Sequence, residues 1–155
     1  MFNNLDTLLI KVASRCNLDC SYCYVYQGQD QNWVNQPKRI SNETIDSICK
    51  SIDQVTSFQN NGFAVVLHGG EPLLLGSVKL KELLSKLRRV LPNYDKYPIA
   101  IQTNGILLSD EIIEICSHYK TSISVSLDGV KKSNDIARFT HDGQSSFQKV
   151  INGIN

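Results

Sequence analysis

Strand-like and helix-like patterns of hydrophobic residues take turns along this chain. Leu8, Ile10 and Val12 occupy every second position of segment 7–14, which predicts a strand. The later run 63–67 is almost continuously apolar, as is typical of a strand covered on both faces. Together the patterns predict four strands, at residues 7–14, 63–67, 98–102 and 122–127.

Between and after these strands, apolar residues recur at the spacing of a helix. Ser41 and Ser109 are candidate N-caps of two helices, a leucine stripe marks a third at 77–90, and a fourth begins at about Ser145. The apolar helical positions are Ile45, Ile48, Cys49, Ile52, Val55, Leu80, Leu83, Leu84, Leu87, Ile112, Ile113, Ile115, Cys116, Phe147, Val150, Ile151 and Ile154. We therefore expect Cys49 and Cys116 to pack in the core.

Strands that alternate with helices predict an α/β fold with a parallel sheet and right-handed crossovers. Ligands of such folds bind at the C-terminal edge of the strands. Segments rich in cysteine, glycine and polar residues follow the four predicted strands, at residues 16–23, 68–73, 102–105 and 126–129. The sequence thus predicts one site, built from four loops at that edge.

The first of these segments has cysteines at 16, 20 and 23, a C-x3-C-x2-C spacing. Three thiolates can hold three corners of a [4Fe–4S] cluster and leave one iron open to another ligand. A zinc site or a buried cysteine cluster are the alternative interpretations. Zinc would need a fourth nitrogen or sulfur ligand, and the chain has no second CxxC and no nearby histidine.

Composition narrows the class of protein further. A chain of 155 residues suits one domain, and a net charge of +1 gives no strong attraction to nucleic acid or to a membrane surface. An odd number of cysteines, five, with three of them clustered, indicates metal binding in a reducing cytoplasm rather than a disulfide framework. No apolar stretch approaches the about 18 residues of a membrane span.

The four segments resemble motifs of radical S-adenosylmethionine (radical SAM) enzymes. CNLDCSYC resembles the CxxxCxxC signature, and residues 68–73, 102–105 and 126–129 resemble the GGEP, QTNG and SLDG motifs in the family's order. The tail is similar to that of SPASM-type peptide maturases, such as anaerobic sulfatase-maturating enzymes, and segment 24–37 to that of cyclophane-forming maturases. The tail residues are Asp135, Arg138, Gly143, Ser146 and Phe147. Asn134 stands where the family usually has histidine.

This resemblance implies a partial (β/α) barrel, of which about four βα units of an expected six are present. It implies a [4Fe–4S] cluster held by Cys16, Cys20 and Cys23, and S-adenosylmethionine cleaved there to a 5′-deoxyadenosyl radical. The radical would crosslink or oxidise a peptide or protein side chain, and flavodoxin or ferredoxin would supply electrons. We expect residues 1–155 to be the N-terminal portion of the core domain, without its C-terminal SPASM-like domain. The alternative is a non-catalytic iron–sulfur module or inactive remnant, acting by electron transfer or partner binding.

The resemblance also assigns cofactor contacts, although no catalytic residue. The segment Gly69, Gly70, Glu71 and Pro72 would bind the amino group of S-adenosylmethionine, and Ser126 and Arg138 its carboxylate or ribose. Each has a plainer interpretation, in which the glycines form an ordinary turn and Arg138 is a surface charge. The further expected contacts are Tyr22, Gln102, Thr103, Asn104 and Asp128, for which turn formation by Asn104-Gly105 and Asp128-Gly129 is the alternative. Tyr22 and the following Tyr24, Val25 and Tyr26 are expected to shield the cluster from water.

Overall fold

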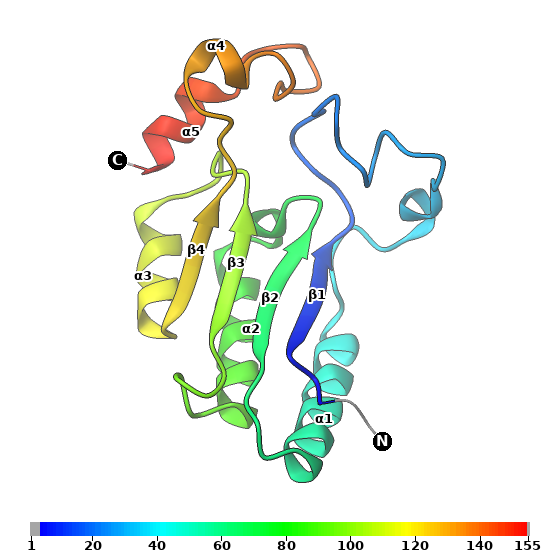
Figure 1. The fold of residues 1–155 in the computed structure, drawn as a ribbon, viewed down its shortest axis with the longest axis vertical. Helices are drawn as coiled ribbons and strands as arrows, with labels where there is room; N and C mark the ends of the chain where they lie inside the picture. Colours follow the sequence, from blue (N-terminus) through cyan, green and yellow to red (C-terminus); the bar gives the residue numbers. More distant parts are fainter. Residues whose placement is uncertain (1–3, 155) are drawn as a thin grey trace.

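The computed structural model describes residues 4–154. Four parallel strands form one sheet in chain order, which confirms the predicted α/β fold (Figure 1). They are β1 (Thr7–Ala13), β2 (Ala64–Gly69), β3 (Ile99–Thr103) and β4 (Thr121–Val125). The ends of each predicted strand lie within two residues of the observed ends. The agreement is close because the apolar runs end where the backbone turns into the loops.

The four predicted helices are present, together with three short ones that the apolar pattern did not indicate. Ser41 and Ser109 cap their helices as expected, because each hydroxyl accepts a backbone N–H, from Thr44 and Ile112 respectively. The longer helices are α1 (Asn42–Phe58), α2 (Ser77–Val90), α3 (Asp110–His118) and α5 (Phe147–Ile154). The short ones are η1 (Asn32–Asn35), η2 (Pro72–Leu75) and α4 (Lys131–Asn134).

One face of the sheet packs on helices. Ile10, Leu67, Ile101 and Ile123 lie side by side in neighbouring strands, and they join the buried apolar residues of α1, α2 and α3. Cys116 is buried in this core and Cys49 is half-buried against it, as predicted.

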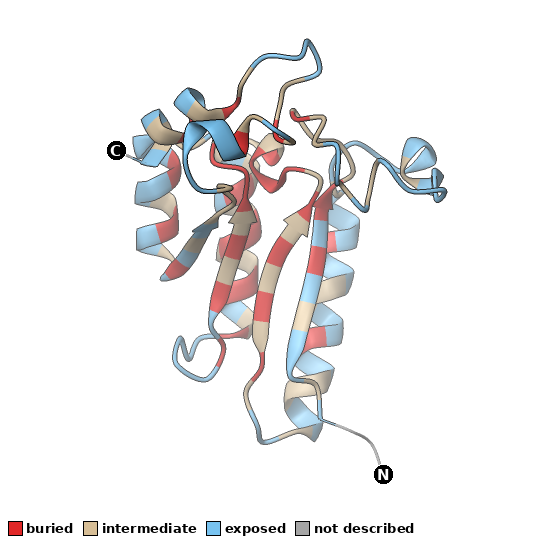
Figure 2. Ribbon diagram, turned by 45° about the horizontal axis from the view of Figure 1, so that its top comes forward, coloured by how far each residue is buried: buried red, intermediate tan, exposed pale blue. Residues whose placement is uncertain are grey.

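The other face of the sheet is more open. Buried and half-buried positions alternate along β2, whose Val66 and His68 are only half-buried (Figure 2). The prediction that this strand is covered on both faces is therefore wrong, because all the longer helices that flank the strands lie on the opposite face (Figure 1). Lys11 pairs with His68, and Gln102 with Ser124, so polar side chains mark this face near its C-terminal edge.

The chain beyond β4 folds back over the C-terminal edge of the sheet. Helices α4 and α5 lie above β3 and β4, and the segment between them reaches toward the loop that follows β1 (Figure 1). Leu18 and Thr140 form an antiparallel bridge there. Among residues 4–154, no helix is both long enough and apolar enough to cross a membrane.

Candidate functional site

The cysteine loop is held in place by a segment more than a hundred residues further along the chain. The backbone N–H of Asp19 donates to the carbonyl of Phe139 at 2.8 Å, and that of Ser21 donates to Ala137 at 3.0 Å. A ring nitrogen of His141 lies 3.0 Å from the carbonyl oxygen of Cys16. The loop therefore has a strand-like partner, which the spacing of the cysteines did not indicate.

The three cysteines of this loop are half-buried free thiols. Burial raises the pKa of Cys16 to about 11 and raises that of Cys20, so without metal these groups carry their protons. Coordination by a metal deprotonates a thiol outright. Within residues 4–154, no three side chains of the histidine, cysteine, aspartate and glutamate types converge as ligands of one metal ion. Ligands of a cubane need no such convergence, because each binds a different iron.

Two glycines bring the end of β2 against the start of the cysteine loop. Gly70 donates its N–H to Ala13 at 2.9 Å, and the next N–H, of Glu71, donates to Arg15 at 2.9 Å. A Cβ on Gly70 would lie 1.8 Å from Tyr26 Oη and 2.4 Å from the Arg15 carbonyl oxygen, and Gly69 has a φ of +143°. These positions require glycine because the protein's own backbone passes so close.

The Glu71 side chain turns into the protein. It is 0% exposed, and its carboxylate accepts hydrogen bonds from Leu73 N at 2.9 Å, Thr103 Oγ1 at 2.7 Å and Asn104 N at 2.8 Å. Burial raises its pKa, and the three hydrogen bonds offset part of that rise. These three protein donors tie the carboxylate to the turn after β2 and to the end of β3, and its expected contact with an ammonium group stays a prediction. Pro72 is also buried, at the first position of η2.

The polar residues at the end of β3 connect the neighbouring loops. Asn104 Nδ2 donates to Asn17 Oδ1 at 2.7 Å and lies 3.7 Å from Cys16 Sγ. Gln102 Nε2 donates to Ser126 Oγ at 2.8 Å. The QTNG-like segment thus contacts both the cysteine loop and the SLDG-like segment, and Asn17, which sequence reasoning missed, belongs to the site.

A second junction joins Tyr22, Asp128 and Arg138. Tyr22 Oη donates to Asp128 Oδ2 at 2.7 Å and accepts from Arg138 Nη1 at 2.6 Å. Arg138 is 7% exposed and its Nε is buried without a partner. The surface-charge interpretation of Arg138 is therefore wrong. Asn134, at the family's histidine position, is fully buried and donates to Ser146 Oγ at 3.1 Å.

The expected aromatic shield is only partly present. Tyr22 is 55% exposed and Tyr24 is 76% exposed. Segment 24–37 runs beside β1 (Figure 1). Tyr26 packs edge-on against Trp33 with ring centroids 4.8 Å apart, and the Arg15 guanidinium lies 5.0 Å from the centre of the indole. Of these side chains, the hydroxyl of Tyr26 is the one that lies nearest to Gly70.

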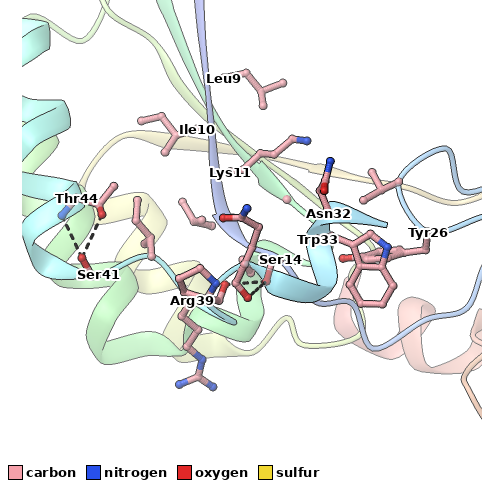
Figure 3. Close-up of a pocket in the computed structure, with 18 of the residues that line it drawn as sticks. Leu9, Ile10, Lys11, Ser14, Tyr26, Asn32, Trp33, Arg39, Ser41 and Thr44 are labelled. Carbon is pink, nitrogen blue, oxygen red and sulfur yellow. Dashed lines mark hydrogen bonds between the residues drawn. The ribbon is translucent and has the colours of Figure 1, made fainter. Parts of the chain in front are cut away.

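A groove of about 790 Å³ lies between β1, segment 24–37 and the start of α1 (Figure 3). Gly69 and Gly70 are among the residues that line it. Tyr26, Trp33 and Asn32 line one side of it, and Leu9 and Lys11 project from β1 (Figure 3). Tyr26 Oη and Trp33 Nε1 are buried there without partners.

Comparison with known proteins agrees with these motifs. The family model of the Radical SAM superfamily matches residues 10–155. A cysteine-type anaerobic sulfatase-maturating enzyme of Clostridium perfringens is 31% identical, over 93% of this chain and 38% of that enzyme. A serine-type enzyme of the same name from Bacteroides thetaiotaomicron is 32% identical, over 97% of this chain and 36% of that enzyme. The radical SAM cyclopropyl synthase TigE of Paramaledivibacter caminithermalis is 26% identical, over 97% of this chain and 32% of that enzyme.

Solved structures resemble the fold described above. Native anSMEcpe with bound AdoMet superimposes with a TM-score of 0.77 and 28% identity, over 97% of this chain and 39% of that one. The same protein with bound AdoMet and the Cp18Cys peptide gives a TM-score of 0.76 and 27% identity. The chain spans 32–38% of the length of the three curated relatives named above.

Proposed function

The chain belongs to the radical SAM superfamily, and from that premise we propose that it modifies a side chain of a peptide or protein. Membership of the family implies a [4Fe–4S] cluster and S-adenosylmethionine as cofactors. When bound, this pair supplies reductive cleavage of S-adenosylmethionine and hence a hydrogen-abstracting radical. The observation that carries the proposal is that all four motif-bearing loops are hydrogen-bonded to one another at one edge of the sheet.

The donor set fits the cluster. Cys16, Cys20 and Cys23 offer three sulfurs from one loop, and the sulfur of Cys16 accepts N–H groups from the Leu18 backbone and the Asn104 side chain. Hydrogen bonds to sulfur are typical of iron–sulfur sites, where they help to set the reduction potential. Three ligands for four irons leave one iron for S-adenosylmethionine.

The polar residues around the cysteines fit the charged ends of S-adenosylmethionine. Arg138 has a buried Nε–H without a partner, and a guanidinium that keeps a free donor suits a carboxylate. Ser126 accepts a hydrogen bond from Gln102, so its own hydroxyl hydrogen is left to donate. Backbone carbonyls of Gly69 and Gly70 would accept from the amino group. In this proposal, these residues bind and orient the cofactor and do not react.

The peptide substrate is proposed from the relatives. Two of them are named as sulfatase-maturating enzymes, and one solved structure contains a bound peptide. The chain spans less than two fifths of the length of these enzymes. We therefore also propose, rather than observe, that the electron donor is a protein such as flavodoxin or ferredoxin. The assignment of these residues to the N-terminal portion of a core domain is likewise a proposal.

Electron paramagnetic resonance tests the cofactor part of this proposal. The chain is reconstituted with iron and sulfide without oxygen, reduced with dithionite, and measured with and without S-adenosylmethionine. We expect a [4Fe–4S]⁺ signal that changes when S-adenosylmethionine is added. A signal that is indifferent to S-adenosylmethionine would instead support the non-catalytic iron–sulfur module.

A substitution in the cysteine loop separates the enzyme from that alternative. Cys20→Ala removes one proposed ligand, so formation of 5′-deoxyadenosine from S-adenosylmethionine should be lost. Cys116→Ala is the matched control, since that thiol is buried in the core away from the edge. Product formed equally by both variants would contradict the proposed ligand set.

A further inference from the structure

The side-chain amide of Asn104 lies against the sulfur of Cys16. Its Nδ2 is 3.7 Å from Sγ and 2.7 Å from Asn17 Oδ1, so the two hydrogens of the amide point to two different acceptors. The same sulfur accepts the backbone N–H of Leu18 at 3.4 Å. Among the hydrogen bonds of residues 4–154, those to sulfur in this loop all reach Cys16, and none reaches Cys20 or Cys23.

The orientation of this amide is fixed by its surroundings. Asn104 Oδ1 accepts the backbone N–H of Ile106 at 3.1 Å, which turns the NH₂ group toward the cysteine loop. The backbone N–H of Asn104 donates to Glu71 Oε2 at 2.8 Å. Asn104 is 6% exposed, so water does not compete for these contacts.

Glu71 fixes the position from which Asn104 acts. Its other oxygen, Oε1, accepts from Thr103 Oγ1 and from Leu73 N. The carboxylate therefore ties the end of β3 to the turn that follows β2. Asn104 contacts both residues: its backbone N–H donates to Glu71, and its side-chain amide donates to the sulfur of Cys16.

We propose that Asn104 sets the reduction potential of the iron–sulfur cluster through its hydrogen bond to Cys16, and that Glu71 is the positioning residue that holds Asn104. This inference rests on the proposed function, since it needs a cluster on Cys16. Reduction adds negative charge to a cluster and its sulfurs, and an N–H donor stabilises that charge, so the donor raises the potential. One hydrogen bond of ordinary net strength changes such an equilibrium about tenfold, which is about 59 mV for one electron.

Potentiometric titration of the reconstituted chain, followed by electron paramagnetic resonance, tests this role. Asn104→Ala removes the donor, and Asn104→Asp keeps the size and the acceptor for Ile106 but loses both N–H groups. We expect Asn104→Ala to shift the reduction equilibrium about tenfold toward the oxidised cluster, and Glu71→Gln to shift it less. Asn104→Asp should shift it further than Asn104→Ala, because its carboxylate also adds a negative charge beside the cluster. Asn61→Asp makes the same substitution at an exposed position away from the cysteines and should leave the potential unchanged. Asn104→Ala adds no charge and is therefore the variant that isolates the loss of the donor.

Iron and sulfide content and visible absorbance are measured on every variant, so that a lost cluster is not mistaken for a shifted potential. A fully loaded Asn104→Ala chain with the wild-type potential would overturn the inference. A wild-type chain whose cluster signal ignores S-adenosylmethionine would instead overturn the proposed function.

Should neither Asn104 variant hold a cluster, the wild type alone decides. Asparagine labelled with ¹⁵N only in the side-chain amide is incorporated into both the wild-type chain and the Asn17→Asp chain, and in the latter Asn104 is the labelled residue beside Cys16. Pulsed electron paramagnetic resonance of the reduced wild-type and Asn17→Asp chains should then show the same weak ¹⁵N coupling. Absence of that coupling from the wild type would overturn the inference.

Discussion

The guanidinium of Arg138 donates from Nη1 to the phenolic oxygen of Tyr22 at 2.6 Å, across 116 positions of the sequence. The same phenol donates to Asp128, so one tyrosine hydroxyl joins the cysteine loop, the end of β4 and the segment after α4. This junction holds three segments of the candidate site together. It also leaves the Nε–H of Arg138 without a partner in the protein.

Arg138→Gln should weaken the binding of S-adenosylmethionine about ten- to hundredfold, because it removes a charge-assisted hydrogen bond of about 1.5–3 kcal/mol. Equilibrium dialysis with the reconstituted chain measures the change, and the iron content should stay that of the wild type. Arg89→Gln makes the same change of charge at an exposed position and serves as control. Equal affinities of the two variants would contradict a cofactor contact of Arg138.

Gly70→Ala should lower the free energy of unfolding by about 1–3 kcal/mol, the usual cost of overpacking. The new methyl group would lie 1.8 Å from Tyr26 Oη and 2.4 Å from a backbone oxygen of Arg15, and the backbone oxygen cannot rotate away. Because the cysteine loop starts at Arg15, the variant should also take up less iron. Urea denaturation and iron analysis check both effects.

Gly28→Ala is the control for that experiment. Its new Cβ would meet Tyr24 O at 3.2 Å, a contact that needs a shift of only a few tenths of an ångström. Stability and iron uptake close to wild type in Gly28→Ala, with losses in Gly70→Ala, would locate the effect at the turn. A stable, fully loaded Gly70→Ala chain would contradict the close packing described here.

The buried carboxyl group of Glu71 gives the cluster-free chain a specific pH dependence. Burial raises its pKa above that of a glutamate in an unfolded chain, which is about 4.3. The folded chain therefore keeps this proton to higher pH than the unfolded chain does. The resulting contribution to stability is complete below about pH 4.3 and is lost as the pH rises through the raised pKa of the folded state.

Urea denaturation of the wild type and of Glu71→Gln between pH 4 and pH 8 measures this effect. Glutamine keeps the shape and does not titrate, so the stability of the wild type relative to Glu71→Gln should fall as the pH rises. Glu114→Gln, at an exposed position of α3, should show no such trend. If the stability of the wild type relative to Glu71→Gln rises with pH, the three hydrogen bonds lower the pKa of Glu71 by more than burial raises it.

Arg88→Lys should destabilise the fold by about 2 kcal/mol. The Arg88 guanidinium is buried and donates to three carbonyl oxygens at 2.7–2.8 Å, which belong to Tyr97, Tyr119 and Lys120. A lysine ammonium lacks the planar fork that reaches all three, and an unpaired buried carbonyl costs about 1–3 kcal/mol. Arg89→Lys, the exposed neighbour, is the control, and thermal unfolding of the two variants gives the comparison.

The fold was largely predictable from local pattern. The helix period between the strands and the N-cap serines at 41 and 109 predicted four βα units, and the structure confirms them. The short helix α4 and the openness of one sheet face were not predictable, because a half-buried valine such as Val66 looks the same in sequence as a fully covered one.

The site was predictable as a set of motifs but not as a set of contacts. Glycine, glutamate and asparagine after successive strands indicated a common edge, yet the sequence did not separate residues that face a ligand from residues that face each other. Glu71 and Asn134 are both fully buried, and their partners lie 32 and 12 positions away. Hydrogen bonds between distant loops leave no periodic signal.

The sequence by itself determined the order of strands and helices, the loop that carries Cys16, Cys20 and Cys23, and the meeting of four loops at one edge. These follow from periodicity and from the geometry of parallel sheets, which are local or topological rules. Only the tertiary structure decided that Glu71 faces inward, that Asn104 contacts Cys16 and that Arg138 is buried against Tyr22. Such contacts depend on which side chains the completed fold brings within about 3–4 Å, and no single stretch of sequence contains that information.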